Sequence, residues 1–370
     1  MLQGHEPVVM VPAEGLDKAW AVEILDGVQV LRLTALRIRD IGYVRRTIGE
    51  TILPFAMLYG IRKSPFRSTQ WGAVIWYSPS IFFGPLVAAL KRSSNCRSYL
   101  ILRDIFPEWA VDLGLLRRGP AYHFFKMVAR YQYAVADTIG VQSPSNLAYL
   151  SDWTKRPGRR LEVLQNWLAA APNAGSSISV SATSLAGKTI FVYIGNMGVA
   201  QGMDILIDLA ASLRNRRDIG FLFVGRGSDV SRLRASVAKQ ALDNILFYDE
   251  VDSREMPGLL AQCHIGLVAL DPRHKTHNVP GKFLTYMQAG LPVLARINAG
   301  TDLADLIEKE EVGRVYVGES LEALQQIAEQ LADDRSGRKQ MSARGSALAQ
   351  RMFSSTAAAG QIVAALSNHG

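Results

Sequence analysis

Hydrophobic positions between residues 188 and 296 form short continuous runs that alternate with segments of helical period. The continuous runs predict strands over residues 189–194, 220–224, 245–248, 265–270 and 292–295. The segments between them predict helices over residues 203–213, 230–240, 256–262 and 282–288. Strands that are apolar along their whole length are typical of a parallel sheet covered by helices on both faces. Such a sheet binds ligands beyond the carboxyl ends of its strands.

Residues 1–168 show the same alternation less clearly. Here the pattern predicts strands over residues 8–11, 28–33, 73–76, 99–102 and 138–142, and a helix over residues 120–134. We therefore predict an α/β protein with two doubly wound domains. Residues 1–7 resemble the end of a helix and residues 8–11 a second strand, so we expect the first domain to lack its first strand and its Gly-rich turn. Either the start codon lies further upstream or the protein is truncated.

The composition changes most sharply between residues 169 and 187, where Ala, Ser and Gly dominate without a helical or strand period. This segment predicts a linker. The domains then cover residues 1–168 and 188–350, and residues 351–370 form a C-terminal helix that we expect to pack back on the first domain. A length of 370 residues agrees with this division, because it exceeds what one compact core usually holds.

The chain carries a formal net charge of +8, which favours anionic partners such as an acidic membrane surface or a phosphorylated ligand. Its basic residues form no compact tract, so we expect no nucleic acid partner. Cys96 and Cys263 lack metal-ligand spacing and fit buried thiols in a reducing compartment. The best apolar stretch, residues 81–90, is shorter than the ~20 residues of a membrane span, and no secretory signal is visible. We therefore expect a cytoplasmic protein.

The turn that follows the predicted strand 189–194 is rich in glycine and precedes a predicted helix. Glycines let the backbone approach a phosphate, and a helix N-terminus presents free N–H groups. Alternatively, this is a tight strand-to-helix turn that binds nothing. The candidate ligand-binding residues of this turn are Gly195, Asn196, Gly198 and Gln201.

Two further strand ends carry basic residues. Arg226 lies between Gly225 and Gly227 after the next strand, and it can supply charge for a diphosphate. Lys282 lies in the first turn of a helix headed by Pro280, where its charge opposes the helix dipole and so indicates an anion. Alternatively, both are ordinary solvated side chains.

The three turns together resemble the C-terminal domain of the GT4-type retaining glycosyltransferases, which have the GT-B fold. Within this family, the chain resembles the bacterial branch that builds O-antigen and capsule polysaccharides, which includes N-acetyl-fucosamine transferases. The resemblance covers about residues 188–351. Its motifs are Tyr193-Ile194-Gly195-Asn196 with Gln201-Gly202, then Phe223-Val224-Gly225-Arg226-Gly227, then Pro280-x-Lys282 with Ala289-Gly290-x-Pro292-Val293.

The resemblance implies two Rossmann-like domains that face a cleft, with the nucleotide sugar bound to the second domain and the acceptor to the first. It implies that Arg226 and Lys282 neutralise the diphosphate and that transfer retains the anomeric configuration. Because basic side chains can replace a metal in this role, we expect neither a metal nor a cofactor. The implied donor-binding residues are Gly195, Asn196, Gly198, Gln201, Gly225, Gly227, Val279, Pro280 and Thr285.

In the first domain, residues 103–108 resemble the family segment that faces the donor. The resemblance implies Asp104 as a catalytic residue, with Arg103 and Glu108 on the acceptor side. The sequence departs from the family at three points. Thr285 stands where the family has a glutamate, a second glutamate near Asn278 is missing, and Arg103 stands where many relatives have histidine.

The resemblance also implies a UDP-linked donor and a lipid-linked saccharide acceptor in O-antigen or capsule synthesis. Residues 37–67 mix basic and apolar side chains, and such a segment can lie on an anionic membrane face. We therefore expect peripheral association with the inner face of the cytoplasmic membrane. The alternative is an amphipathic helix packed on its own domain.

Other functions fit parts of the pattern. A GT-B nucleotide-sugar 2-epimerase shares the architecture, although its usual catalytic carboxylates and histidine are not recognisable here. A truncated or non-catalytic relative would bind a nucleotide sugar without transferring it. A nucleic-acid-binding protein would show steeply salt-dependent binding.

Overall fold

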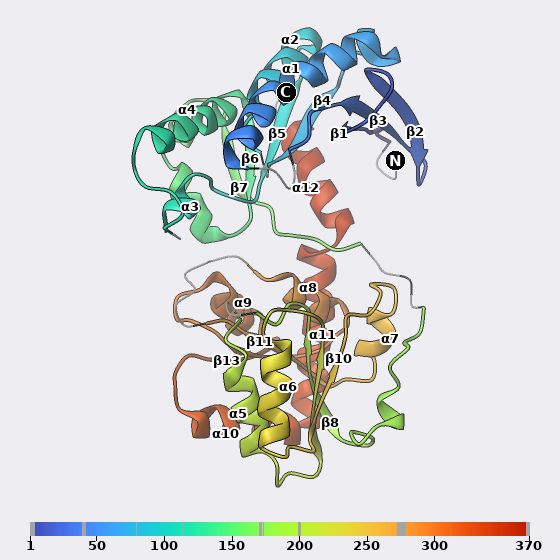
Figure 1. Ribbon diagram of the computed structural model, residues 1–370, viewed down its shortest axis with the longest axis vertical. Helices are drawn as coiled ribbons and strands as arrows, with labels where there is room; N and C mark the ends of the chain where they lie inside the picture. The colour runs from blue at the N-terminus through green and yellow to red at the C-terminus, as the bar shows by residue number, and fades with distance from the viewer. Residues whose placement is uncertain are drawn as a thin grey trace. The chain divides into compact units, whose positions relative to one another are not determined.

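The structure of the protein is a computed structural model that describes residues 4–38, 42–78, 80–112, 114–169, 172, 174–198, 201–271 and 279–367 (Figure 1). The chain divides into two compact units. The first unit comprises Met1–Val141, Asn146–Leu164 and Ile362–Gly370, and the second comprises Gln142–Ser145 and Gln165–Gln361. The second unit thus takes in a four-residue piece of the first half of the chain, which the hydrophobic pattern did not predict.

The second unit is built on a six-stranded parallel sheet in the order β10-β9-β8-β11-β12-β13 (Figure 1). Its strands are β8 (Thr189–Ile194), β9 (Ile219–Val224), β10 (Ile245–Tyr248), β11 (Ile265–Ala269), β12 (Val293–Arg296) and β13 (Gly313–Tyr316). The chain first builds outward from β8 to β10 and then returns to place β11 on the other side of β8. The order therefore reverses between β8 and β11, and sheets of this kind bind ligands in the crevice outside the carboxyl ends at that reversal.

Helices cover both faces of this sheet. Ile190 and Val192 of β8 pack into a core with residues of α8 and α11, whereas Phe191 and Tyr193 pack into a core with residues of α5 and α10. Burial on both faces explains why the strand is apolar at every position. The helices are η4 (Val180–Ala182), α5 (Asp204–Ser212), α6 (Val230–Lys239), α7 (Met256–Leu260), α8 (Gly281–Gln288), α9 (Asp302–Glu310), α10 (Leu321–Asp333) and α11 (Arg335–Met352).

The described residues of the first unit form two sheets. In the first sheet, β3 lies between β1, which is parallel to it, and β2, which is antiparallel. The second is a parallel sheet in the order β4-β5-β6-β7. The strands are β1 (Val8–Ala13), β2 (Trp20–Leu25), β3 (Val28–Thr34), β4 (Ala73–Ser78), β5 (Arg97–Leu102), β6 (Thr138–Val141) and β7 (Arg160–Val163). The helices are α1 (Tyr43–Lys63), η1 (Pro65–Ser68), α2 (Gly84–Ser94), α3 (Glu108–Asp112), α4 (Pro120–Val135), η2 (Pro144–Leu150) and η3 (Trp153–Lys155).

The strands and helices predicted from the hydrophobic pattern are all present, with ends shifted by one or two residues. The predicted linker is packed in part, because Ile178, Val180 and Leu185 are buried in the core of the second unit. These three residues follow no regular period, so the pattern does not distinguish them from a free linker. The last helix, α12 (Ser355–Ser367), starts in the second unit, and its residues from Ile362 onward belong to the first.

Among the described helices, none combines the length and the apolar character that a membrane crossing needs.

Candidate functional site

The Gly-rich turn lies directly after β8, at the carboxyl end of the sheet. Gly195 has a φ of 99°, and both it and Asn196 are exposed, whereas Gly198 is buried. The side-chain oxygen of Gln201 accepts hydrogen bonds from the Asn196 side chain and from the Gly198 backbone N–H, both at 3.0 Å. Gln201 thus closes the turn on itself. The structure brings these four predicted donor-binding residues together.

The turn after β9 packs backbone to backbone against the Gly-rich turn. The Met197 N–H donates to the Arg226 carbonyl at 2.8 Å. Gly225 and Gly227 have φ values of 152° and 157°, and a Cβ on them would lie 2.0 Å and 2.1 Å from carbonyl oxygens of the other turn. Both glycines are therefore required by the close approach of the two turns, a reason that is independent of any ligand.

Arg226 is exposed at the end of β9. Its Nε lies 3.1 Å from the Glu250 carboxylate, and the two side chains are 82% and 55% exposed. A surface pair of this kind contributes at most about 1 kcal/mol, so its guanidinium can exchange Glu250 for another anion at little cost. The interpretation of Arg226 as a solvated side chain holds for this structure.

Lys282 differs from Arg226 because it is partly buried. Its ammonium nitrogen lies 3.6 Å from the centroid of the Tyr193 ring, a cation–π contact. Burial lowers the pKa of Lys282 to about 7. The interpretation of Lys282 as an ordinary solvated lysine is therefore wrong. A lysine held in this way gains from an incoming anion, which would restore its charge.

Tyr286 fixes α8 at the point where the strand order reverses, and the sequence interpretation missed it. This tyrosine is fully buried. Its hydroxyl accepts a hydrogen bond from the Ile194 N–H at 3.1 Å and lies within donating distance of the Val192 and Leu267 carbonyls, at 3.1 Å and 3.2 Å. The hydroxyl thus joins α8 to both β8 and β11. Residues four apart lie on one side of a helix, so Tyr286 also sets the position of Lys282.

The remaining predicted donor residues of α8 have different roles. Val279 is buried in the core, so its side chain does not face a ligand. Pro280 forms the N-cap and has no side-chain acceptor, which leaves backbone N–H groups at the helix start available. The Thr285 hydroxyl donates to the Gly281 carbonyl at 3.2 Å. Asn278 lies outside the described residues.

Arg296, a second residue that the sequence interpretation missed, ties neighbouring strand ends together. It ends β12 and is 8% exposed. Its guanidinium donates to the Leu270 carbonyl at 3.0 Å and to the Gly318 carbonyl at 3.3 Å. These carbonyls follow β11 and β13, so Arg296 stabilises the carboxyl edge of the sheet.

The acceptor-side residues follow β5 in the first unit. Arg103 is buried and donates to the Leu164 carbonyl at 2.5 Å, and burial lowers its pKa. Partial burial raises the pKa of Asp104, against the opposing effect of the Arg103 charge. The Glu108 carboxylate lies 2.9 Å from the Lys126 ammonium group. Arg103 therefore supports the backbone in this structure, and Asp104 is the more exposed of the two neighbours.

A search for metal ligands finds no group of three or more His, Cys, Asp or Glu side chains suited to a metal ion in the described part of the chain.

Comparison with known proteins finds a family that the second unit resembles. Residues 188–334 match the family described as glycosyl transferases group 1. The second unit is thus similar in sequence to group 1 glycosyl transferases over these residues. The family match coincides with the stretch that carries the Gly-rich turn, Arg226 and Lys282.

Two curated relatives support this assignment. The chain is 24% identical over 230 residues to the probable glycosyltransferase WbjE of Pseudomonas aeruginosa. The aligned residues cover 60% of this chain and 57% of that protein. It is also 24% identical over 260 residues to the putative colanic acid biosynthesis glycosyl transferase WcaI of Escherichia coli K12. Here the aligned residues cover 68% of this chain and 64% of that protein. The match thus spans about three fifths of the length of these relatives.

Solved structures confirm the predicted GT-B fold of two Rossmann-like domains. Sucrose-phosphate synthase from Thermosynechococcus elongatus matches 98% of this chain and 88% of its own, with a TM-score of 0.68 and 18% identity. WaaG, a glycosyltransferase involved in lipopolysaccharide biosynthesis, matches 100% and 93%, with a TM-score of 0.61 and 14% identity. Anabaena HepE in complex with UDP and glucose matches 93% and 87%, with a TM-score of 0.63 and 15% identity.

Proposed function

We propose that this protein is a retaining GT4-type glycosyltransferase that moves a sugar from a UDP-linked donor to a lipid-linked saccharide during synthesis of a surface polysaccharide. The observation that carries the proposal is the partly buried Lys282 at the strand-order reversal of a unit that resembles group 1 glycosyl transferases. The names of the relatives support the pathway, since WcaI is named for colanic acid and WaaG for lipopolysaccharide. Transfer of N-acetyl-fucosamine follows only from the resemblance in sequence.

The diphosphate of the donor binds where α8 begins. Departure of the nucleoside diphosphate builds up negative charge, which Lys282, Arg226 and the N-terminus of α8 stabilise. Arriving phosphate raises the pKa of Lys282 and so charges it as the donor binds. Asn196 and Gly198 line the approach on the other side of the crevice. Since side chains and helix supply the positive charge, the reaction proceeds without a metal or other cofactor.

The acceptor-side residues are those that follow β5. In this proposal Asp104 accepts the proton of the acceptor hydroxyl, a role that suits a carboxyl with a raised pKa. Arg103 positions this segment through its bond to the Leu164 carbonyl. The sugar is transferred by attack from the same face as the leaving group, which retains the anomeric configuration without a covalent enzyme intermediate.

The lipid-linked acceptor brings the protein to the inner face of the cytoplasmic membrane. Helix α1 supports this proposal, because one side of it is apolar and exposed while Leu53, Met57 and Ile61 on its other side are buried. The exposed apolar residues of α1 are Tyr43, Val44, Ile48, Ile52, Phe55 and Tyr59. Exposed basic residues lie at both ends of the helix, with Arg45 and Arg46 at its start and Arg62 and Lys63 at its end. An apolar face with basic flanks suits an anionic bilayer.

A nucleotide-sugar screen tests the enzymatic proposal. The purified protein is incubated with UDP-linked and other nucleotide sugars and a bacterial lipid extract, and release of nucleotide and labelling of lipid are measured. We expect UDP-sugars to give lipid labelling, and NMR of the product to show the anomeric configuration of the donor. An inverted product would contradict the retaining mechanism, and the absence of UDP binding would contradict the donor site.

A second candidate is a relative that binds the nucleotide sugar without transferring it. The observation that favours it is Thr285, whose hydroxyl bonds to its own helix and supplies no carboxylate where the family has one. This candidate predicts UDP binding with no transfer to any lipid in the same screen.

A further inference from the structure

A basic hollow lies at the opposite edge of the second unit from the proposed donor site. It has a volume of about 540 Å³ and opens at the amino ends of β8, β11 and β12. Its charged and polar lining includes Lys188, His264, Arg335, Arg338, Lys339 and Ser342. None of the residues that line it is an aspartate or a glutamate. The lining of the hollow therefore carries cations and no carboxylate.

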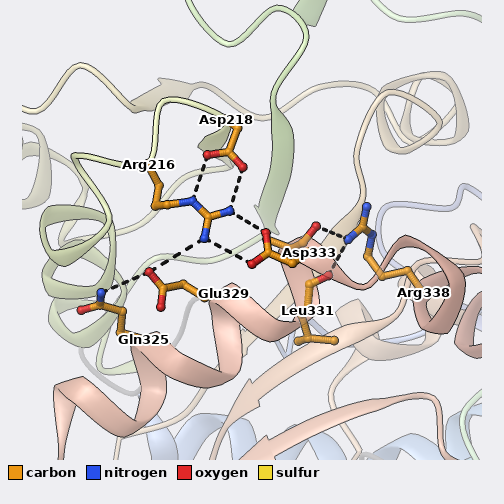
Figure 2. Close-up of polar contacts among 8 residues, drawn as sticks. Arg216, Asp218, Gln325, Glu329, Leu331, Asp333 and Arg338 are labelled. Carbon is orange, nitrogen blue, oxygen red and sulfur yellow. Dashed lines mark hydrogen bonds and ion pairs between the residues drawn. The ribbon is translucent and has the colours of Figure 1, made fainter.

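Carboxylates near the hollow are already engaged. Figure 2 shows Arg216 between the carboxylates of Asp333 and Asp218. The distances to them are 2.6 Å and 2.8 Å. Asp334 accepts the Gly337 N–H at 2.7 Å and so caps α11. Among the described residues, none forms an ion pair with Lys188, Arg335 or Lys339. None of the three is held in an ion pair, although the charge of Lys188 helps to lower the pKa of the Asp243 carboxyl.

Arg338 has a different role, since it caps the preceding helix. Its Nη1 donates to the Leu331 and Ala332 carbonyls at the end of α10 (Figure 2). This fixes the start of α11, and with it the positions of Arg335 and Lys339 one turn apart. The start of α11 is the positive end of an 18-residue helix and has no acidic residue in its first turn. The N-cap carboxylate of Asp334 offsets part of the positive charge at that end, and the basic side chains of the first turn add to the rest.

His264 adds a neutral hydrogen-bond donor to the wall. Its Nδ1 accepts the Ile190 N–H at 3.0 Å, so the neutral ring carries its proton on Nε2. Burial lowers the pKa of His264, and the charges of Arg338 and Arg335 lower it further. The ring is therefore favoured in its neutral form, which can donate one hydrogen bond.

We propose that this hollow binds a phosphate group, carried either by a small soluble molecule or by a lipid headgroup. Arg335, Lys339 and Lys188 supply the charge, and His264 supplies a hydrogen bond. Arginine and lysine in combination suit phosphate oxygens, and the volume has room for more than the phosphate itself. The site takes no part in donor binding, because it lies at the amino ends of the strands whose carboxyl ends form the crevice.

Titration of the full chain with inorganic phosphate, followed by calorimetry in a chloride buffer of low ionic strength, tests the site. The double substitution Arg335→Ala/Lys339→Ala removes two exposed cations, and we expect it to weaken phosphate binding by about tenfold or more. The control Lys239→Ala/Lys309→Ala removes the same charge from exposed positions outside the hollow and should leave binding unchanged. Equal weakening in both variants, or no saturable binding by the wild type, would overturn the proposal.

Two further measurements separate this site from the donor site and identify the source of the phosphate. Lys282→Ala should still bind phosphate at the hollow. The test of the hollow therefore gives its answer even if the proposed donor site is wrong. Glucose 6-phosphate and vesicles containing phosphatidylglycerol are then compared on wild type and on the Arg335→Ala/Lys339→Ala protein. Weaker binding of glucose 6-phosphate by the variant indicates a soluble ligand, and weaker vesicle binding alone indicates a lipid headgroup. A variant that matches wild type with both probes contradicts a phosphate site.

Discussion

The face of the Tyr193 ring supports the Lys282 ammonium group at 3.6 Å, while its hydroxyl donates to the Asn196 carbonyl at 2.7 Å. One side chain at the end of β8 therefore connects the Gly-rich turn with the basic residue of α8. These are the two elements that the proposed diphosphate would touch. The position of the Lys282 ammonium group therefore depends on how well the Gly-rich turn is formed.

The lowered pKa of Lys282 predicts a pH-dependent stability. The group is charged in the unfolded chain up to about pH 10.4 but only below about pH 7 in the folded one, so its burial is most costly below pH 7. Lys282→Met should raise the free energy of unfolding at pH 6 by roughly 1–3 kcal/mol more than at pH 9. Urea unfolding at the two pH values measures this difference. A gain that is the same at both would show that Lys282 keeps an ordinary pKa.

The contact between the turns predicts that Gly225 tolerates no side chain. A Cβ there would lie 2.0 Å from the Gly195 carbonyl oxygen, and the φ of 152° is itself strained for other residues. Gly225→Ala should lower the free energy of unfolding by about 2 kcal/mol or more. Gly281→Ala is the matched control, because no atom of the described residues lies within 4 Å of the added Cβ and alanine favours a helix. Similar thermal unfolding of the two variants would contradict the close approach.

The fold of the second unit was largely predictable because its strands are buried on both faces and are therefore apolar throughout. The positions of Gly195, Arg226 and Lys282 followed from the same pattern, since each lies at the end of a predicted strand or at the start of a predicted helix. The sequence could not show that Gly225 and Gly227 serve the packing of two turns, because that contact joins segments 30 residues apart in the chain.

Other features depend on tertiary contacts that no local pattern contains. Tyr286 lies on the apolar face of α8. Its hydroxyl finds hydrogen-bond partners only because the folded sheet places β8 beside β11. Arg296 reaches carbonyls of two other strands, which become neighbours only in the folded sheet. Ile178 lies in a Ser-rich segment without period, yet the core of the second unit buries it.

The hydroxyl of Tyr286 predicts a stability effect coupled to ligand binding. Tyr286→Phe would leave the buried Ile194 N–H without its acceptor, which should cost about 1–3 kcal/mol in chemical denaturation. It should also weaken UDP binding, since α8 and Lys282 lose an anchor. Tyr149→Phe removes a hydroxyl from an exposed tyrosine and serves as the control. Unchanged stability would show that the hydroxyl does not hold α8 to the strands.

The exposed face of α1 predicts binding to anionic vesicles. Replacing Val44, Ile48 and Ile52 by serine removes apolar surface without touching the buried side of the helix, and should weaken vesicle binding by about tenfold or more. Co-sedimentation with phosphatidylglycerol vesicles measures this. Val317→Ser changes an exposed apolar residue of the second unit and should have no effect. Vesicle binding by the triple variant at the wild-type level would rule out this face as the membrane contact.

The exposed pair of Arg226 and Glu250 predicts that replacing Arg226 weakens UDP binding without lowering the stability of the fold. Since the pair is exposed, Arg226→Ala should change the free energy of unfolding by no more than about 0.5 kcal/mol. Loss of a charged contact to the diphosphate should nevertheless raise the Kd for UDP by about tenfold, measured by calorimetry. Arg234→Ala removes a comparable exposed arginine from α6, paired with Asp249, and is the matched control. An unchanged Kd for Arg226→Ala would remove this residue from the donor site and leave Lys282 and the helix N-terminus to balance the diphosphate.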